Sequence, residues 1–272
     1  MRYEKSIPTK HFFEPKLPDG VTADELSKVY TEKFSKKDSP GREYYDLIQG
    51  NTNGGKCPIC GGSGKIQLDH YLPKSKHPTL CVNPLNLIPI CDTCNGTKKD
   101  KEYSAKDGRP IHLYLDQLPT KEDSFGDLYT EQFLYAKLDS NFVATFRVKC
   151  PSEWDKKIKT RLKNHMTLYE LLERYKDYVP NIYSDISSLL RENAKQLVKK
   201  REPDEQKHKL LLDELLHSDE RITLLEDIIV SKAEDAVKID INSWESALYQ
   251  ALMPKIAKFA QWLFDSDMSP IK

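Results

Sequence analysis

Four cysteines in two CxxC pairs constrain the fold of this chain more than any other feature. The pairs are Cys57/Cys60 and Cys91/Cys94. Each pair can bring two sulfurs to one side of a turn, so four thiolates can close a tetrahedral zinc site. Because four sulfurs leave no open coordination position, we expect this zinc to be structural and not catalytic. The alternative is four unrelated buried thiols, which the spacing disfavours.

The residues between the two pairs carry the groups suited to chemistry. Lys65–Leu68 alternates polar and apolar residues, which predicts a strand, and Asp69 and His70 follow it directly. Neighbours on a regular strand face opposite sides, so we expect the chain to bend here if both side chains act on one bound group. Leu87–Ile90 predicts a second short strand, and a helix should begin near Asp92.

An asparagine and an aspartate form a candidate site for a hard metal ion. Asn95 falls in the first turn of the expected helix, across the hairpin from Asp69. Carboxylate and amide oxygens suit Mg²⁺ or Mn²⁺. Structural alternatives exist, because Asn95 is also a good cap or turn residue, His70 could be a buried histidine satisfied by hydrogen bonds, and Asn86 fits a turn.

The order of these residues resembles the HNH endonuclease family. Asp-His, then Asn-Leu, then Cys-x-x-Cys-Asn and a lysine follow one another between residues 57 and 101. The resemblance implies a strand–strand–helix (ββα-metal) core that hydrolyses phosphodiester bonds with the help of a metal ion. The family often has His where Asn95 stands, and Asn is a common variant that keeps the role.

The resemblance also implies a role for each matching residue. His70 would be the general base, and Asp69 and Asn95 would hold the catalytic Mg²⁺ or Mn²⁺. Asn86 would orient the loop and the base, and Lys98 would face the cleft and steady the phosphate. The chemistry agrees, because a histidine with a pKa near ~6.5 can take a proton from water at neutral pH.

Lysines within this stretch are candidates for contacting nucleic acid. The whole chain balances 42 basic against 42 acidic residues, so no global field favours a polyanion. Residues 56–101, however, contain seven lysines against three acids, a formal charge of +4. We select Lys74, Lys76, Lys98 and Lys99 as substrate-binding candidates. A solvated surface is the default explanation of such lysines, and the charge is compatible with phosphate contact.

The rest of the chain predicts an α+β protein in four segments. They are an N-terminal arm with helices over 1–55, the nuclease core over 56–110, short strands and a hairpin over 111–152, and a helical domain over 153–272. Strands are expected at 111–115, 132–138 and 142–149. Helices are expected from Thr22, where Glu25 completes a capping box, and at 41–49, 153–164, 167–177, 181–200, 204–216, 219–237 and 242–264. Pro254 should kink the last helix.

Two further features concern packing. An apolar series on the helix over 181–200 is expected to face the core: Ile182, Ile186, Leu189, Leu190 and Leu197. Residues 1–20, with the pair Phe12-Phe13, read as an extended arm that packs on its own domain or docks on a partner. This arm lacks the apolar region of a signal peptide, and no run approaches membrane-spanning length. A structural zinc then fits best with a reducing cytoplasm.

The broader layout resembles a second group of proteins. An early CxxC, DHYLPKS, NLIPICDTCN and a helical tail resemble the HNH subunits of Septu-type phage-defence systems, in which such a nuclease partners an ABC/SMC-like ATPase.

Three functions compete: a DNA endonuclease, an RNA-cutting toxin-like effector with the same site, and a non-catalytic zinc module that binds nucleic acid or protein. A zinc deaminase is excluded, because none of the seven histidines begins an H-x-E.

Overall fold

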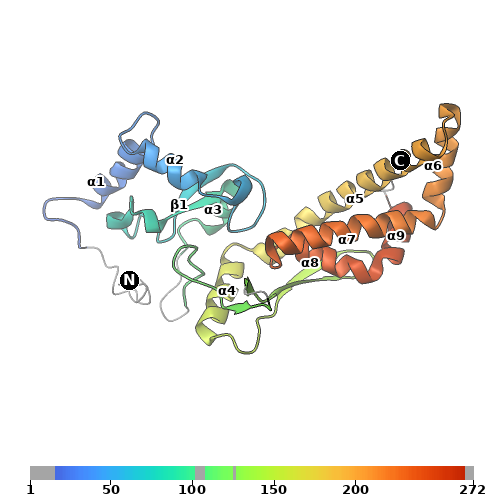
Figure 1. Ribbon diagram of the computed structural model, residues 1–272. Helices are drawn as coiled ribbons and strands as arrows, with labels where there is room; N and C mark the ends of the chain where they lie inside the picture. The colour runs from blue at the N-terminus through green and yellow to red at the C-terminus, as the bar shows by residue number, and fades with distance from the viewer. Residues whose placement is uncertain (1–15, 102–107, 125–126, 267–272) are drawn as a thin grey trace. The chain divides into compact units, whose positions relative to one another are not determined.

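The computed structural model describes residues 16–101, 108–124 and 127–266. The chain divides into two compact units (Figure 1). The first contains the residues up to Pro119 together with Glu153–Leu171, and the second contains Thr120–Ser152 and the residues from Leu172 onward. Helices predominate and the strands form small antiparallel pairs, so the expected α+β class is confirmed.

A two-stranded hairpin followed by a helix lies at the centre of the first unit. Strands β1 (Ile66–His70) and β2 (Leu87–Cys91) pair antiparallel, from Ile66 opposite Cys91 to His70 opposite Leu87. Helix α3 (Asp92–Lys98) follows at once and packs on both strands. Both predicted strands and the predicted helix start are therefore confirmed, and Asn95 lies in the first turn of α3 as expected.

The bend expected at Asp69 and His70 does not interrupt the strand. Asp69 pairs with Ile88 and His70 with Leu87, so both are regular members of β1. The ladder continues one step further, because the Tyr71 N–H donates to the Asn86 carbonyl at 2.8 Å. The pairing of the two strands is therefore continuous from Ile66 to Tyr71.

Two short helices pack against the hairpin. Helix α1 (Ala23–Lys28) begins with the predicted capping box: the Thr22 N–H donates to Glu25 Oε2 at 2.8 Å, and the Glu25 N–H donates to Thr22 Oγ1 at 3.3 Å. A π-helical turn (Val29–Phe34) and α2 (Arg42–Gly50) follow. Their apolar side chains share a small core with the hairpin, made of Tyr30, Phe34, Tyr45, Leu68, Cys81 and Leu87. The pair Phe12-Phe13 lies outside the described residues.

The strand predicted at 111–115 is also wrong. These residues form a turn in which the N–H groups of Leu115 and Asp116 both donate to the His112 carbonyl, at 3.2 and 3.0 Å. The Asp116 carboxylate closes the turn by accepting from the His112 N–H at 2.8 Å. Helix α4 (Lys156–Leu168) completes the unit, and Asp155 caps its N-terminus.

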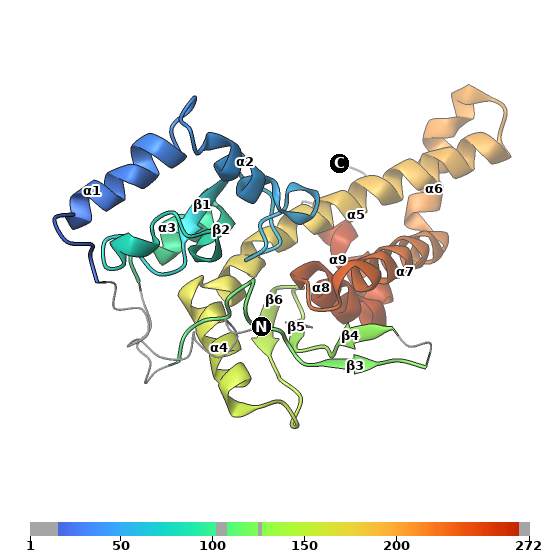
Figure 2. The same ribbon diagram turned by 60° about the vertical axis from the view of Figure 1, so that its left-hand side comes forward.

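The second unit combines two small sheets with long helices (Figure 2). The expected hairpin is confirmed as β5 (Leu134–Leu138) and β6 (Ala144–Val148), and an unexpected pair, β3 (Thr120–Glu122) and β4 (Leu128–Thr130), precedes it. The helices are α5 (Leu171–Arg201), α6 (His208–His217), α7 (Glu220–Asp240), α8 (Trp244–Leu252) and α9 (Ile256–Asp265). Helix α8 packs on β5 and α7.

Pro254 interrupts a helix of the second unit, whereas Pro180 lies within a continuous one. The kink expected at Pro254 is confirmed as a 3₁₀ turn, Met253–Lys255, between α8 and α9. In contrast, two helices were expected on either side of Pro180, and one continuous α5 is found. Pro180 removes one backbone hydrogen bond, but the flanking Val179 and Tyr183 are both buried, so packing keeps the helix continuous.

The buried stripe of α5 differs in part from the predicted one. Ile186 and Leu190 are fully buried as expected, whereas Leu189 is 37% exposed. The stripe instead consists of residues spaced three and four apart: Val179, Tyr183, Ile186, Leu190, Ala194 and Val198. This spacing keeps one face of a 3.6-residue helix toward the core.

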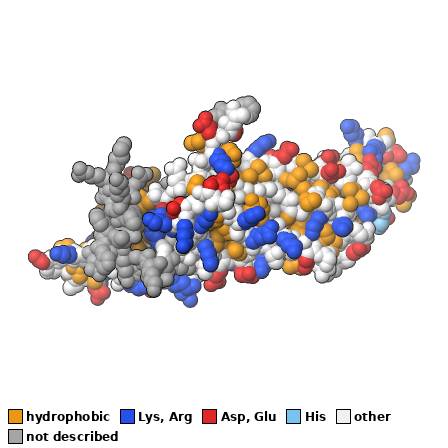
Figure 3. Space-filling model, turned by 90° about the horizontal axis from the view of Figure 1, so that it is seen from below, with side chains coloured by type: hydrophobic (Ala, Val, Ile, Leu, Met, Phe, Trp, Pro, Cys, Tyr) orange, Lys and Arg blue, Asp and Glu red, His pale blue; other side chains and the backbone are white. Residues whose placement is uncertain are grey.

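Several large apolar side chains remain on the surface of the second unit. The most exposed are Ile239, Leu128, Leu210 and Val143. On the face shown in Figure 3, Lys and Arg side chains stand between the apolar ones. Within the described residues, no helix has the length and apolar character needed to cross a bilayer.

Candidate functional site

Four cysteine sulfurs meet where the hairpin joins α3. Cys57 and Cys60 come from the turn before β1, Cys91 ends β2, and Cys94 lies in α3. All four are buried, and their sulfurs lie within 4.8 Å of one another. The sequence prediction that these two pairs converge is confirmed.

The cluster has the dimensions of a zinc tetrathiolate. Zn–S bonds of ~2.3 Å in a tetrahedron place the sulfurs ~3.8 Å apart, and Cys60 Sγ lies 3.9 Å from Cys91 Sγ. Backbone N–H groups of Gly62, Cys91 and Cys94 point at cysteine sulfurs at 3.3–3.4 Å, as thiolates require. Hydrogen bonds from Cys57 and then Cys94 lower the pKa of the Cys60 thiol, which favours the thiolate form. The four cysteines could therefore bind zinc.

Asp69 of β1 and Lys98 of α3 form an ion pair. Asp69 Oδ2 lies 2.8 Å from Lys98 Nζ. The Asp69 side chain is 13% exposed, while that of Lys98 is only 2% exposed. The same ammonium donates to the His70 carbonyl at 2.7 Å. Lys98 therefore holds the Asp69 carboxylate close to the end of β1. The burial of Lys98 differs from the open, cleft-facing position that the sequence suggested.

His70 lies on the other face of β1, held by a backbone carbonyl. Its Nε2 is 2.8 Å from the Cys81 carbonyl oxygen, and its ring contacts Tyr30 edge-on with centroids 4.5 Å apart. Because a carbonyl can only accept, Nε2 carries the proton and the lone pair of the neutral ring is on Nδ1. Burial lowers the pKa of His70 from its ordinary value, which favours the neutral form of the ring.

Asn86 fixes the loop between the two strands. Its Oδ1 accepts from the Leu72 N–H at 2.8 Å, and its Nδ2 donates to the carbonyls of Leu72 and Leu80 at 3.1 and 3.2 Å. Three hydrogen bonds from one buried amide hold the loop after His70. The role of orienting His70, which the family resemblance implies for Asn86, stays a prediction, because these bonds join Asn86 to Leu72 and Leu80.

The remaining candidate residues lie on or near α3 and the loop after β1. Asn95 is half-buried in α3. Lys74 Nζ lies 5.2 Å from the centroid of the Tyr30 ring, and the same ring contacts His70. Lys76 is exposed and donates to the Asp100 carbonyl at 3.4 Å. Lys99 is exposed at the end of α3, with φ of 50°.

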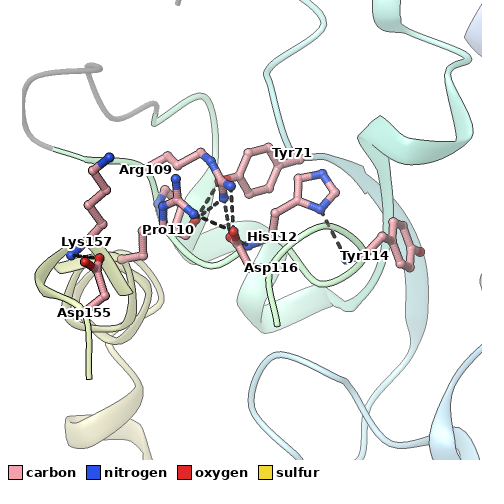
Figure 4. A network of polar contacts seen from close by, with 9 residues as sticks. Tyr71, Arg109, Pro110, His112, Tyr114, Asp116, Asp155 and Lys157 are labelled. Carbon is pink, nitrogen blue, oxygen red and sulfur yellow. Dashed lines mark hydrogen bonds and ion pairs between the residues drawn. The ribbon is translucent and has the colours of Figure 1, made fainter. Parts of the chain in front are cut away.

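Sequence reasoning missed a buried polar network behind the site (Figure 4). Arg109 and Arg161 both pair with the carboxylate of Asp116, which is only 4% exposed. Although burial raises the pKa of Asp116, hydrogen bonds from Arg109 and from the His112 N–H bring it below the usual value. No motif marks this network, because its members come from the turn after α3 and from α4.

The network reaches both strands of the hairpin. Tyr71, the residue after His70, donates its hydroxyl to the Pro110 carbonyl at 2.7 Å and packs on the His112 ring at 4.3 Å. Tyr114 donates its hydroxyl to the Leu87 carbonyl at 3.1 Å. The end of β1 and the start of β2 are therefore both tied to the turn that Asp116 closes.

Two curated proteins are similar to parts of this chain. Protein ea31 of Escherichia phage lambda is 34% identical over 166 residues, which are 57% of this chain and 51% of ea31. Septu protein PtuB of Bacillus thuringiensis is 30% identical over 95 residues, 32% of this chain and 36% of PtuB. The matches thus span about half of one relative and a third of the other. No protein-family model and no solved structure matches the chain.

Proposed function

We propose that this protein is a metal-dependent HNH endonuclease that hydrolyses phosphodiester bonds, with DNA as its substrate. The observation that carries the proposal is the placement of His70. The Cys81 carbonyl holds its Nε2, and the residue lies next to a carboxylate on a strand–strand–helix unit. The similarity to Septu protein PtuB supports a role in phage defence.

His70 acts as the general base through Nδ1. With Nε2 committed to Cys81, Nδ1 is the ring atom that can take a proton from an attacking water. The lowered pKa keeps this lone pair available at neutral pH. Asn86 is a positioning residue, because its three hydrogen bonds hold the loop that follows His70.

Asp69 and Asn95 are the residues that would hold the catalytic Mg²⁺ or Mn²⁺. Both offer oxygen atoms, the donors that these ions prefer, and α3 packs against the strand that carries Asp69. When bound, such an ion neutralises charge on the phosphate and on the leaving oxygen. Lys74, Lys76 and Lys99 stand on the loop after β1 and at the end of α3, where they would contact substrate phosphates.

Three single substitutions test the division of roles. His70→Ala should keep the zinc and nucleic-acid affinity but lose cleavage by ~10²–10⁴-fold, because it removes the proton acceptor and none of the metal ligands. Asp69→Ala and Asn95→Ala should lose cleavage through weaker metal binding, so excess Mn²⁺ should partly restore them. Equal rescue of all three variants by Mn²⁺, or wild-type cleavage by His70→Ala, contradicts the assignment.

The assay should use plasmid DNA and total RNA side by side, with Mg²⁺. Cleavage of DNA supports the proposed substrate. Cleavage of RNA alone would instead support the toxin-like effector with the same site, since nothing in the site reads a 2′-hydroxyl. Lys101→Met is a suitable control, because Lys101 pairs with Glu170 at the surface and carries no proposed role.

The similarity to a Septu protein also suggests a partner protein and a cellular compartment for this chain. By analogy with Septu-type systems, we propose that an ABC/SMC-like ATPase binds this chain, in the reducing cytoplasm where its cysteines stay unoxidised. Exposed apolar side chains of the second unit, such as Ile239 and Leu210, are candidates for contact. Co-expression with an ABC/SMC-like ATPase of a Septu-type system tests this: Ile239→Lys should abolish co-purification and leave the zinc content unchanged.

A further inference from the structure

Lys98 uses all of its hydrogen-bonding capacity inside the protein. Its Nζ donates to the His70 carbonyl at 2.7 Å, pairs with Asp69 Oδ2 at 2.8 Å, and lies 3.5 Å from the Lys99 carbonyl. An ammonium has three N–H donors, so these three acceptors satisfy it. With 2% of its side chain exposed, Lys98 has no donor left for a substrate phosphate.

The ion pair occupies one oxygen of the proposed metal ligand. Oδ2 of Asp69 is held by the ammonium, so a divalent ion must share the carboxylate with Lys98 or displace it. Two cations on one carboxylate repel each other, and this repulsion is strong in a poorly solvated site. Each cation must therefore lower the affinity of the other for Asp69.

The strained backbone of Lys99 provides one of the hydrogen-bond acceptors of the Lys98 ammonium. Lys99 adopts φ 50° and ψ −135°, a region that residues other than glycine rarely occupy. In this conformation its N–H donates to the Asn95 carbonyl at 2.9 Å, while its own carbonyl lies near Lys98 Nζ. The end of α3 thus turns back to contribute an acceptor for the buried ammonium.

We propose that Lys98 is a positioning residue and not a phosphate ligand: it holds the Asp69 carboxylate in the metal-free protein and competes with the divalent ion for it. This inference rests on the proposed metal site at Asp69. In the absence of metal, the ammonium neutralises a carboxylate that would otherwise be buried without a partner. The protein therefore gives up some metal affinity for a site that stays ordered when it is empty.

Mn²⁺ binding without nucleic acid tests the proposal, followed by electron paramagnetic resonance of the free ion in zinc-loaded protein. Lys98→Gln keeps a donor for Asp69 but removes the charge, and Lys98→Met removes both. Each should bind Mn²⁺ on the order of tenfold more tightly than the wild type. The control Lys101→Met, which removes the same charge from a residue 53% exposed, should change the affinity less than twofold. Unchanged or weaker binding by folded Lys98→Gln overturns the proposal.

Two further variants separate this inference from the proposed function. If Asp69→Ala binds Mn²⁺ as well as the wild type, the metal site itself is wrong, whatever the Lys98 variants do. If both Lys98 variants fail to fold, the double variant Asp69→Asn/Lys98→Gln decides, because it removes both charges of the pair. Recovery of the fold supports the ion pair as the role of Lys98, and continued failure overturns it.

Discussion

Acidification from pH 7.0 to 5.5 should destabilise the first unit through His112. This buried ring lies between Tyr71 and Tyr114, with ring centroids 4.3 and 5.9 Å away. Its Nδ1 accepts from the Tyr114 N–H at 3.3 Å, so a proton added there would face another donor. Burial, followed by the charge of Arg109, lowers the pKa of His112 to about 4.

The size of the effect follows from the two pKa values. An unfolded histidine has a pKa of ~6.5, so the unfolded chain binds more protons than the folded protein between pH 4 and 6.5. The contribution of His112 to the free energy of unfolding is therefore fully present above the pKa of the unfolded chain. It is lost as the pH falls from that value toward the pKa of the folded protein. The loss from His112 is about 1 kcal/mol at pH 5.5 and roughly 3 kcal/mol near pH 4. Burial also lowers the pKa of His165 to about 4, which adds a similar amount.

Urea unfolding at the two pH values, with zinc present, measures this loss. Trp154 lies in the first unit, whereas Trp244 and Trp262 lie in the second. The latter two are replaced by Phe in every variant, so that tryptophan fluorescence reports on the first unit. The parent should lose at least about 2 kcal/mol between pH 7.0 and 5.5, since the lowered pKa of His70 adds to the two losses above, and His112→Gln should lose about 1 kcal/mol less. His217→Gln, at a residue 57% exposed, should behave as the parent does. Equal losses in the parent and in His112→Gln would refute the argument.

Three further predictions concern stability. Purified protein should contain one zinc per chain by metal analysis, and Cys91→Ala or chelation should unfold the first unit, because metal binding contributes to folding there. Asp116→Ala should cost about 3–5 kcal/mol in urea unfolding, since it leaves Arg109 and Arg161 without their buried partner; Glu173→Ala, at an exposed pair, should cost under about 1 kcal/mol. Lys99→Gly should raise the unfolding midpoint, with a gain of about 1 kcal/mol or more, because glycine adopts this φ without strain.

Local signals in the sequence predicted the elements around the candidate site. The capping box at Thr22, the alternation before Asp69 and the CxxC spacing each depend on residues a few positions apart. Physical rules for caps, strands and zinc knuckles apply directly to such short stretches. For that reason the two strands, α3 and the convergence of four cysteines all followed from the sequence.

Features set by tertiary contacts did not follow from the sequence. Ile111–Leu115 has the apolar content of a strand, yet the Asp116 carboxylate closes a turn there, and Arg161, 45 positions away, holds that carboxylate in place. Lys98 has the spacing of a cleft residue, yet the carboxylate of Asp69 and the carbonyl of His70 bury it. In both cases a charged partner distant in the sequence decided the outcome, and periodicity contains no information on such pairs.

The placement of these partners explains how a hairpin of five residue pairs can hold reactive groups in fixed positions. Two strands alone are marginally stable in water. Here the cysteine cluster closes the end at which Ile66 pairs with Cys91, and the Asp116 network ties down the end at which His70 pairs with Leu87. Asp69 and His70 lie beside the second end, so their geometry should depend more on Asp116 than on zinc once the protein is folded. A folded Asp116→Asn variant should therefore alter the environment of His70 while it retains its zinc, and NMR of the His70 ring can measure this.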